Sequence, residues 1–188
     1  MTNPESSDAE DLQIVSEVLQ GDPSAFRNIV DKYQQRIFRV CISHLGSVEE
    51  AEDAVQEIFL RAYKSLHRFK LEKRFLNWLY TIAVNHLKTR YSRIIKLQEK
   101  RDRIMKEPDT PEETPESITE KQIMKDRIRE AVQSLPSKLR EPVVLYYLEE
   151  LSVQDIASAL DIGTENVKSR LFRARKKLRE KLEQSTTE

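Results

Sequence analysis

Apolar side chains recur at intervals of three and four residues along most of the chain, which is the spacing of a helix that buries one face. A strand would instead alternate apolar and polar positions, and the sequence has no such stretch. The predicted helices cover residues 22–45, 47–67, 75–92, 117–134, 139–148 and 152–160, and a last one begins near 164. The pattern predicts an all-α fold.

Residues that typically begin or end helices support these boundaries. Asp22 is followed by Pro23, a residue that suits the first helical position. Gly46 stands where the first of these helices should end. Ser47 and Glu50 are spaced as a capping box at the start of the next.

The natural break in the chain is the stretch 107–117, EPDTPEETPES, which has three prolines and no apolar residue. Such a stretch cannot form a regular helix or a packed core. We therefore expect two small helical domains, residues 11–95 and 119–184, joined by a flexible acidic linker over 96–118. Residues 1–10 are expected to be an N-terminal tail.

The end of the chain has the pattern of a helix-turn-helix, two short helices around a tight turn. Ser152 and Asp155 form an acidic variant of the capping pattern at the first helix. Asp161 and Gly163 tolerate the backbone angles of a turn, and Thr164 is the expected N-cap of the second helix. In this motif the second helix lies in the major groove of DNA.

The outward face of that second helix is rich in groups that bind phosphates and base edges. Its members are Lys168, Ser169, Arg170, Phe172, Arg173, Arg175 and Lys176. Arg170, Arg175 and Lys176 are assigned to phosphates. Two plainer interpretations stay open: the helix is only a solvated basic surface, or Phe172 packs inside the protein.

Charge is strongly segregated, although the 32 basic and 32 acidic residues of the 188-residue chain cancel. Residues 61–106 carry 14 Lys and Arg against 3 acids, residues 107–120 carry 6 acids and no base, and residues 164–188 carry 8 bases against 4 acids. Two basic zones separated by an acidic one suggest two nucleic-acid contacts.

Several classes of protein and of site are not expected. The chain has no apolar run long enough to cross a bilayer, its N-terminus is not a signal peptide, and a cytoplasmic protein without membrane insertion is predicted. The single Cys41 excludes an intramolecular disulfide and is expected to be a buried thiol. His44, His67 and His86 lack ligand spacing, so we expect no metal, cofactor or catalytic residue.

Three strings together resemble the extracytoplasmic-function (ECF) group of bacterial RNA polymerase sigma factors, in the sigma-70 family. They are D-x-V-Q-E-x-F within residues 53–66, F-x-x-W-L-Y-x-I-A-x-N within 74–93, and V-K-S-R-L-F-R-A-R from Val167. The likeness covers the chain from Asp11 to about Leu182. It implies a region 2-like domain followed by a region 4-like domain.

The resemblance implies that the chain binds core polymerase, recognises the −35 and −10 promoter elements and promotes strand opening. The −35 contacts would come from the basic helix face described above. The clamp of the polymerase would be bound by Asp53, Gln56, Glu57, Phe59 and Leu60. The −10 element would be bound, partly as single strands, by Phe69, Lys73, Arg74, Phe75, Tyr80, Asn85, Lys88 and Arg90.

Other implications of the resemblance concern partners and the linker. Residues 146–151 would face the polymerase flap, and an anti-sigma factor would regulate the chain from outside. The linker would thread the polymerase cleft, or simply keep the two domains apart. Residues 70–74, KLEKR, depart from the family's small polar loop, and with this loop we expect attraction to phosphates to contribute more to holding the strand.

Some assignments stay open on the residues alone. Phe59 could be a core residue beside exposed acids. Trp78 is spaced as part of a buried stripe and is assigned to the core rather than to base stacking, whereas Asn85 is the best candidate for a base edge because an amide both donates and accepts. The alternative function is a stand-alone helix-turn-helix regulator, which would bind a two-fold repeated site without polymerase.

Overall fold

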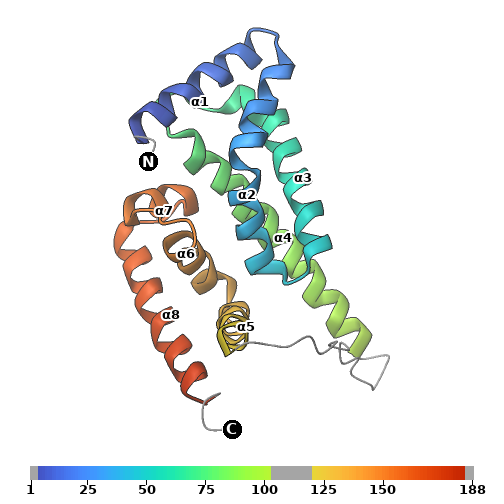
Figure 1. Cartoon of the computed structure of the whole chain (residues 1–188), viewed down its shortest axis with the longest axis vertical. Helices are drawn as coiled ribbons and strands as arrows, with labels where there is room; N and C mark the ends of the chain where they lie inside the picture. The colour runs from blue at the N-terminus through green and yellow to red at the C-terminus, as the bar shows by residue number, and fades with distance from the viewer. Residues whose placement is uncertain (1–3, 103–119, 185–188) are drawn as a thin grey trace.

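The computed structural model describes residues 4–102 and 120–184, and every regular element in these ranges is a helix (Figure 1). In chain order they are α1 (Pro4–Leu19), the 3-10 turn η1 (Pro23–Ala25), α2 (Phe26–Leu45), α3 (Val48–Ser65), the 3-10 turn η2 (Leu66–Arg68), α4 (Phe75–Asp102), α5 (Glu120–Gln133), α6 (Ser137–Tyr147), α7 (Val153–Leu160) and α8 (Thr164–Gln184). The predicted all-α class is confirmed. None of these helices is both long enough and apolar enough to span a membrane.

The first domain comprises α1 to α4, and its helix boundaries follow from local chemistry. Gly46 ends α2 in the left-handed conformation with φ 78°, which glycine adopts without steric cost. The Ser47 hydroxyl then accepts a hydrogen bond of 3.3 Å from the Glu50 backbone N–H. The predicted stop and the predicted cap are both confirmed.

The core of this domain is mainly apolar, although the Asp11 side chain is also completely buried. Cys41 has no exposed surface, and burial raises the pKa of its thiol to about 12, so the prediction of a buried structural thiol is confirmed. The other side chains with no exposed surface in this core include Val15, Ile29, Ile37, Val40, Ala54, Ile58, Leu79 and Ala83.

The second domain comprises α5 to α8, and α7 and α8 form the predicted helix-turn-helix. Ile156 and Val167 are completely buried between these helices. Ser152 caps α7 by accepting a 3.1 Å hydrogen bond from the backbone N–H of Asp155. Asp161 makes the turn in the left-handed conformation, with φ 53° and ψ 50°.

Three boundary predictions are wrong. Helix α1 begins at Pro4, so most of the predicted N-terminal tail is helical. Helix α4 continues to Asp102, so the first seven residues of the predicted linker are helical too. Thr164 is the first residue of α8 rather than its cap, because the carbonyl oxygen of Gly163 already accepts the first hydrogen bonds of this helix; Gly163 itself does not need a positive φ.

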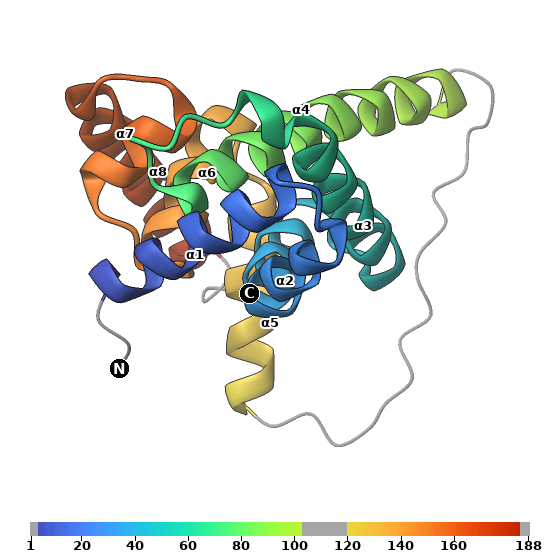
Figure 2. The ribbon, with the colours of Figure 1, turned by 90° about the horizontal axis from the view of Figure 1, so that it is seen from above.

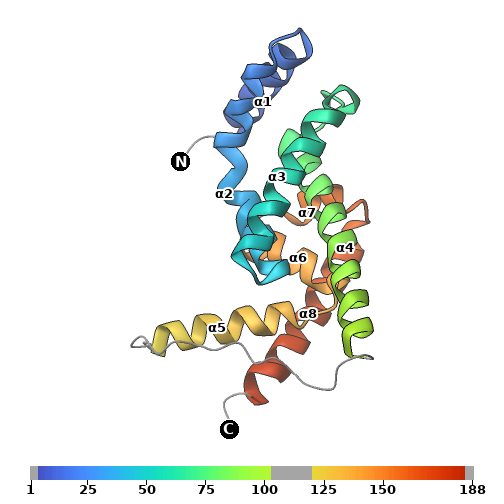
Figure 3. The same ribbon diagram turned by 90° about the vertical axis from the view of Figure 1, so that its right-hand side faces the viewer.

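The two domains pack directly against each other, contrary to a linker that only keeps them apart. Figure 1 shows α6 between α8 and α2, and Figure 2 shows α7 lying along α4 near α1. Figure 3 shows α5 running crosswise to α2 and α3, below their ends. Residues 103–119, to which the predicted path through the polymerase cleft refers, lie outside the described residues.

Candidate nucleic-acid and polymerase-binding surfaces

Helix α8 presents its basic face to solvent, on the side away from the first domain. Phe172 is 69% exposed, so the interpretation that it packs inside the protein is wrong. Val167, Leu171 and Ala174 hold the opposite face of α8 in the core. The seven predicted reader residues, Lys168, Ser169, Arg170, Phe172, Arg173, Arg175 and Lys176, are all exposed or half-buried.

Several of these side chains are ordered by neighbours on the same helix. Arg173 donates to the backbone oxygen and the hydroxyl of Ser169, at 3.3 and 3.2 Å. Arg170 donates to the side-chain oxygen of Asn166 at 3.0 Å. These exposed contacts are weak enough to be exchanged for contacts with DNA, because each one competes with water.

Helix α4 and the loop before it form a second polar surface. Lys73 and Asn85 are exposed, and Arg74 is half-buried. Together with Trp78 and Thr81 they line a hollow of about 450 Å³ between α4 and α7. Leu79 and Ala83 are fully buried and Trp78 packs against the core, so the predicted buried stripe of α4 is confirmed.

The three aromatic residues predicted to touch the −10 element are core residues in this structure. Phe69 is 7% exposed, and its ring lies against Phe75 and Trp78 at centroid distances of 5.5 and 5.3 Å. Phe75 is 1% exposed. With no open ring face, neither Phe69 nor Phe75 can stack on a base, and we correct their assignment to packing.

Tyr80 is buried for a different reason. It has no exposed surface, and its hydroxyl donates a 2.7 Å hydrogen bond to Glu149, a residue of the second domain. Burial and the Glu149 carboxylate raise the pKa of Tyr80, which keeps this donor protonated. In the packed arrangement Tyr80 is therefore a junction residue and not a nucleotide platform.

Two further predicted DNA contacts are engaged in ion pairs. Lys88 lies 3.4 Å from the carboxylate of Glu141, across the domain junction. Arg90 donates to Glu50 at 2.7 Å and lies 3.6 Å from Asp53. Of the predicted −10 cations, Lys73 is the most open to solvent.

Helix α3 presents the face predicted to dock on polymerase. Asp53, Gln56, Glu57 and Leu60 line one hollow of about 640 Å³ on the surface, which confirms that they share a helix face. Leu60 is 45% exposed, an apolar centre among acceptors. Phe59 is only 5% exposed and points into the core, so its assignment as a direct polymerase contact is corrected.

Contacts between residues distant in the sequence hold the two domains together, and Arg74 and Glu149 take part in them although the sequence predicts other roles. The prediction that the whole stretch 146–151 faces the polymerase flap is wrong, because Glu149 and Leu151 are buried. Glu149 is 4% exposed and accepts hydrogen bonds of 2.8 and 2.9 Å from Arg36 and Arg39. Asp155 accepts from Asn77 at 2.7 Å and from Arg74 at 3.0 Å. No sequence signal could have revealed these pairs, because their members are 78 to 113 positions apart and have the pattern of ordinary surface polar residues.

Burial alone would raise the pKa of Asp155. Hydrogen bonds from Asn77 and Ser152 and the charge of Arg74 outweigh this cost, and the pKa of Asp155 is lowered. The carboxylate therefore stays ionised and stabilises both the start of α7 and the junction. Within the described part of the chain, no three His, Cys, Asp or Glu side chains are grouped so that they could hold a metal ion.

Family comparisons agree with this two-part arrangement. The family described as "Sigma-70 region 2" matches residues 29–94, and "Sigma-70, region 4" matches residues 125–178. An ECF RNA polymerase sigma factor of Bacillus subtilis, SigW, is 32% identical over 89% of this chain and 94% of its own length. The chain belongs to the ECF sigma factors. This sigma factor is similarly 30% identical to the sigma-E factor of Escherichia coli K12, over 92% of this chain and 94% of that one.

Solved structures support the fold of the sigma factor. CnrH, solved in complex with the cytosolic domain of CnrY, has a TM-score of 0.71 at 21% identity and covers 93% of this chain and 97% of its own. The sigma factor RpoE of Bartonella quintana, solved with the anti-sigma factor NepR, has a TM-score of 0.65 at 22% identity and covers 84% and 96%. By its family, this sigma factor is a transcription initiation factor of RNA polymerase.

Proposed function

We propose that this sigma factor binds core RNA polymerase through α3, reads the −35 element with α8 and holds the opened −10 element on α4. One observation supports the proposal: the chain has two separate polar surfaces, one on each domain. The second domain exposes the basic face of α8, and the first domain carries cations and the Asn85 amide on α4 and the loop before it. A single helix-turn-helix explains the first surface only. The second is what strand opening requires, since single strands are held by cations along the backbone and by groups that contact bases.

At the −35 element, some side chains of α8 contact bases and others contact phosphates. Lys168, Ser169, Phe172 and Arg173 contact base edges, and the exposed Phe172 ring fits the methyl group of thymine. The phosphate contacts come from Arg170, Arg175 and Lys176. They raise the affinity for any sequence and make it depend on salt.

At the −10 element, Asn85 contacts a base edge and Lys73 and Arg74 hold phosphates. Lys88 and Arg90 join them by exchanging their carboxylate partners for phosphates. The exposed, basic loop 70–74 attracts the strand by charge where the family uses small polar residues.

The α3 face of Asp53, Gln56, Glu57 and Leu60 binds the clamp of core polymerase. The exposed side chains of Tyr146, Tyr147 and Leu148 bind its flap. The sigma factor acts as a subunit and not as an enzyme. It works in the cytoplasm, where the polymerase transcribes.

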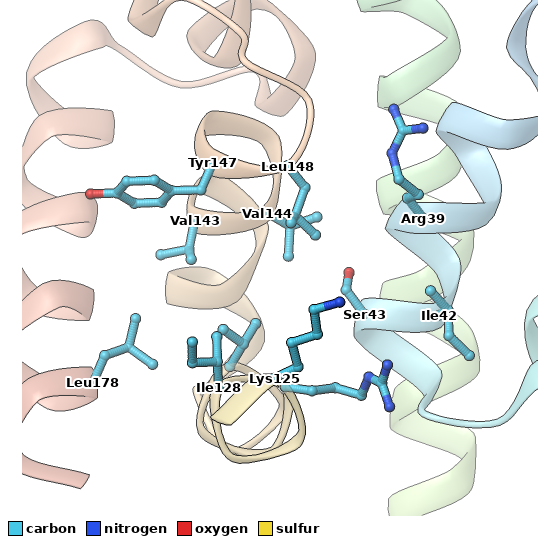
Figure 4. Close-up of a pocket in the computed structure, with 12 residues that line it drawn as sticks. Arg39, Ile42, Ser43, Lys125, Ile128, Val143, Val144, Tyr147, Leu148 and Leu178 are labelled. Atoms are coloured by element: carbon cyan, nitrogen blue, oxygen red, sulfur yellow. The ribbon is translucent and has the colours of Figure 1, made fainter. Parts of the chain in front are cut away.

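An anti-sigma factor regulates the chain by binding a cleft between the two domains (Figure 4). This cleft of about 500 Å³ is formed by α2, α5, α6 and α8 and is mainly apolar, with Ile128, Val143 and Leu178 among its lining residues. Its charged residues, Arg39, Lys125 and Arg129, are all basic. An amphipathic helix with acidic residues beside its apolar face complements both features.

The test is transcription in vitro with purified core polymerase on a library of randomised promoters. Initiation from promoters that share two unlike elements, only when the sigma factor is present, supports the proposal. Glu57→Arg should weaken core binding, whereas Glu130→Arg, at an exposed position on α5, should not. Asn85→Ala should slow formation of the open complex without changing core binding, and Thr89→Ala, one turn further along α4, is its matched control.

The alternative of a stand-alone regulator makes the opposite prediction. Such a protein would occupy a two-fold repeated operator at full affinity without polymerase. That result, together with no binding to core polymerase, would overturn the proposed function.

A further inference from the structure

An apolar side chain stands at the tip of the basic loop between η2 and α4. Leu71 is 55% exposed, although the loop residues on both sides of it are charged. The backbone N–H of Lys73 donates a 2.9 Å hydrogen bond to the backbone oxygen of Lys70, which closes a four-residue turn with Leu71 and Glu72 at its two central positions. A short, defined turn therefore presents Leu71 to solvent.

The turn is fixed at both ends. On the side of η2, the buried ring of Phe69 packs against Phe75 and Trp78, at centroid distances of 5.5 and 5.3 Å. On the side of α4, the guanidinium of Arg74 donates a 2.8 Å hydrogen bond to the carboxylate of Asp8. Because its base is fixed, the side chain at the tip of the turn can press against a ligand without being pushed aside.

Two hollows flank α4, and the turn links them. Arg68, just before the turn, lines a hollow of about 530 Å³ between α3 and α4. Lys73 and Arg74, at the end of the turn and just after it, line the hollow of about 450 Å³ between α4 and α7. Asn85, the proposed base contact, lines both hollows. The turn therefore lies beside the surface that is proposed to hold the opened strand, at the place where the two hollows diverge.

The charges near the turn fit a nucleic acid. Arg61, Lys64 and Arg68 line the hollow between α3 and α4, and none of the described residues that line it is acidic. Phosphates that pass the turn would meet these cations. The face of α3 that is proposed to bind polymerase is acidic instead, with Asp53 and Glu57 on it. Charge complementarity therefore favours DNA, and not the polymerase, as the partner of the turn.

An exposed apolar side chain among cations is suited to opening a base stack. Architectural proteins that kink DNA insert leucine, isoleucine, methionine or phenylalanine between base steps, and cations hold the phosphates nearby. Single exposed apolar residues are common on protein surfaces. Leu71 differs from them in its place at the tip of a fixed turn between two hollows lined by cations.

The spacing along α4 suits a strand that has been separated. The helix begins at Phe75, and Asn85 lies about 15 Å further along its axis at about 1.5 Å per residue. This span takes about four nucleotides at roughly 3.4 Å each. A strand that is separated at the turn can therefore extend along the start of α4 before it reaches Asn85.

We propose that Leu71 is a wedge, which enters the base stack at the edge of the −10 element and unstacks one base step as the strands separate. The inference rests on the proposed function of α4, because it names the residue that separates the strands which that surface then holds. Leu71 acts by filling the space between neighbouring bases. It makes no hydrogen bond to a base, so it promotes opening without reading the sequence.

The experiment separates strand opening from strand holding. Leu71→Ser is assembled with core polymerase on a promoter selected from the randomised library, used either as a duplex or with its −10 region opened by mismatches. Fluorescence of 2-aminopurine in the duplex reports unstacking, and the rate of first-transcript formation is measured on both. Both rates on the duplex should fall about tenfold or more, because the wedge no longer offsets lost stacking. The rate on the mismatched promoter should change by less than about twofold.

Three variants serve as controls. Leu71→Phe keeps an apolar wedge and should open the duplex within about threefold of the parent rate. Leu19→Ser changes a leucine on α1 that is 49% exposed, and it should have no effect on either promoter. Lys73→Ala removes a phosphate contact, so it should weaken binding to both promoters alike and reduce the dependence on salt.

The outcomes are distinguishable. An equal loss for Leu71→Ser on both promoters would show that Leu71 holds bases and does not separate them, which overturns the wedge. Unchanged rates overturn it too, as does weaker binding of Leu71→Ser to core polymerase, which would place Leu71 on the polymerase surface. If the parent chain initiates from neither promoter, the proposed function is refuted and the wedge with it.

Discussion

The guanidinium of Arg140 in α6 donates a 3.0 Å hydrogen bond to the backbone oxygen of His44, in the last turn of α2. The same side chain donates to the backbone oxygens of Gln133 and Leu135, where α5 ends. Arg140 is 1% exposed. One buried cation therefore serves the C-terminal ends of two helices, where carbonyl groups lack intrahelical partners and the helix dipole is negative.

Replacing Arg140 by Met should lower the free energy of unfolding by about 3 to 5 kcal/mol, because buried acceptors lose a charged donor. Arg140→Lys should cost less, since an ammonium group can reach only part of this set. Urea denaturation measures both, with the exposed Lys177→Met as control. A loss in Arg140→Met that matches the control would show that the bridging of the two helix ends adds nothing to stability.

The second prediction concerns the pH dependence of stability. The His44 ring is buried, and its Nε2 atom has no hydrogen-bond partner. Burial, and then the charges of Arg140 and Lys88, lower the pKa of His44 to about 4, although its contact with the Val40 backbone oxygen opposes this. The pKa of His44 is lower in the folded state than in the unfolded state, so folding favours the neutral ring. Its contribution to the free energy of unfolding is therefore fully present above the unfolded pKa of 6.5 and is lost as the pH falls toward 4.

His44→Gln removes this titration. The difference in unfolding free energy between the parent chain and His44→Gln should shrink by about 2 kcal/mol between pH 7 and pH 4.5. Urea denaturation at several pH values measures it. The carboxyl groups of Asp11 and Glu141, whose pKa values burial raises, titrate in both proteins and largely cancel; a difference that does not vary with pH would contradict the assignment to His44.

The third prediction separates base reading from phosphate binding on α8. Arg173 lies along the helix toward Ser169 and is one of the residues proposed to contact bases, whereas Arg175 is proposed to bind a phosphate. Arg173→Ala should relax the preference at one base of the −35 element and cost about 1 to 3 kcal/mol, while Arg175→Ala should weaken all sequences alike. Transcription from randomised promoters gives both selectivity profiles, and indistinguishable profiles would refute the division.

Local chemistry made much of the fold predictable. The stop at Gly46, the cap at Ser47 and the turn at Asp161 depend on groups within a few residues of each other, so the sequence contains the whole interaction. The shared face of Asp53 and Glu57 follows from helix periodicity in the same way.

The remaining features depend on contacts distant in sequence. Nothing near Glu149 indicates that two arginines of α2 will bury it, and Phe69 and Phe75 stand beside a basic loop as nucleic-acid-binding aromatics would. The sequence does not predict helix α1 because its apolar residues do not form a pronounced stripe; of these apolar side chains, Val15 is completely buried and Ile14 is 8% exposed. The packing of the two domains against each other could not be predicted, because it depends on several hydrogen bonds and ion pairs between residues that are distant in the sequence.

The last prediction tests the turn between α7 and α8. Asp161 has φ 53° and ψ 50°, a left-handed conformation that costs most non-glycine residues about 1 kcal/mol or more and glycine nothing. Asp161→Gly should therefore leave the free energy of unfolding unchanged or raise it by up to about 1 kcal/mol, because the gain in the folded state is offset by the greater freedom of glycine in the unfolded chain.

Asp161→Val should lower the free energy of unfolding by more than about 1 kcal/mol, since a β-branched side chain is strongly disfavoured at positive φ. Gly46→Ala should also destabilise the protein, because Gly46 has φ 78° and the added Cβ would lie only 3.0 Å from Gln133 Nε2. This variant removes a glycine from a second left-handed position, whereas Asp161→Gly introduces one. Thermal and urea unfolding of the three variants measure these effects. If Asp161→Val were as stable as Asp161→Gly, the turn could not have the left-handed backbone on which the crossing of α7 and α8 depends.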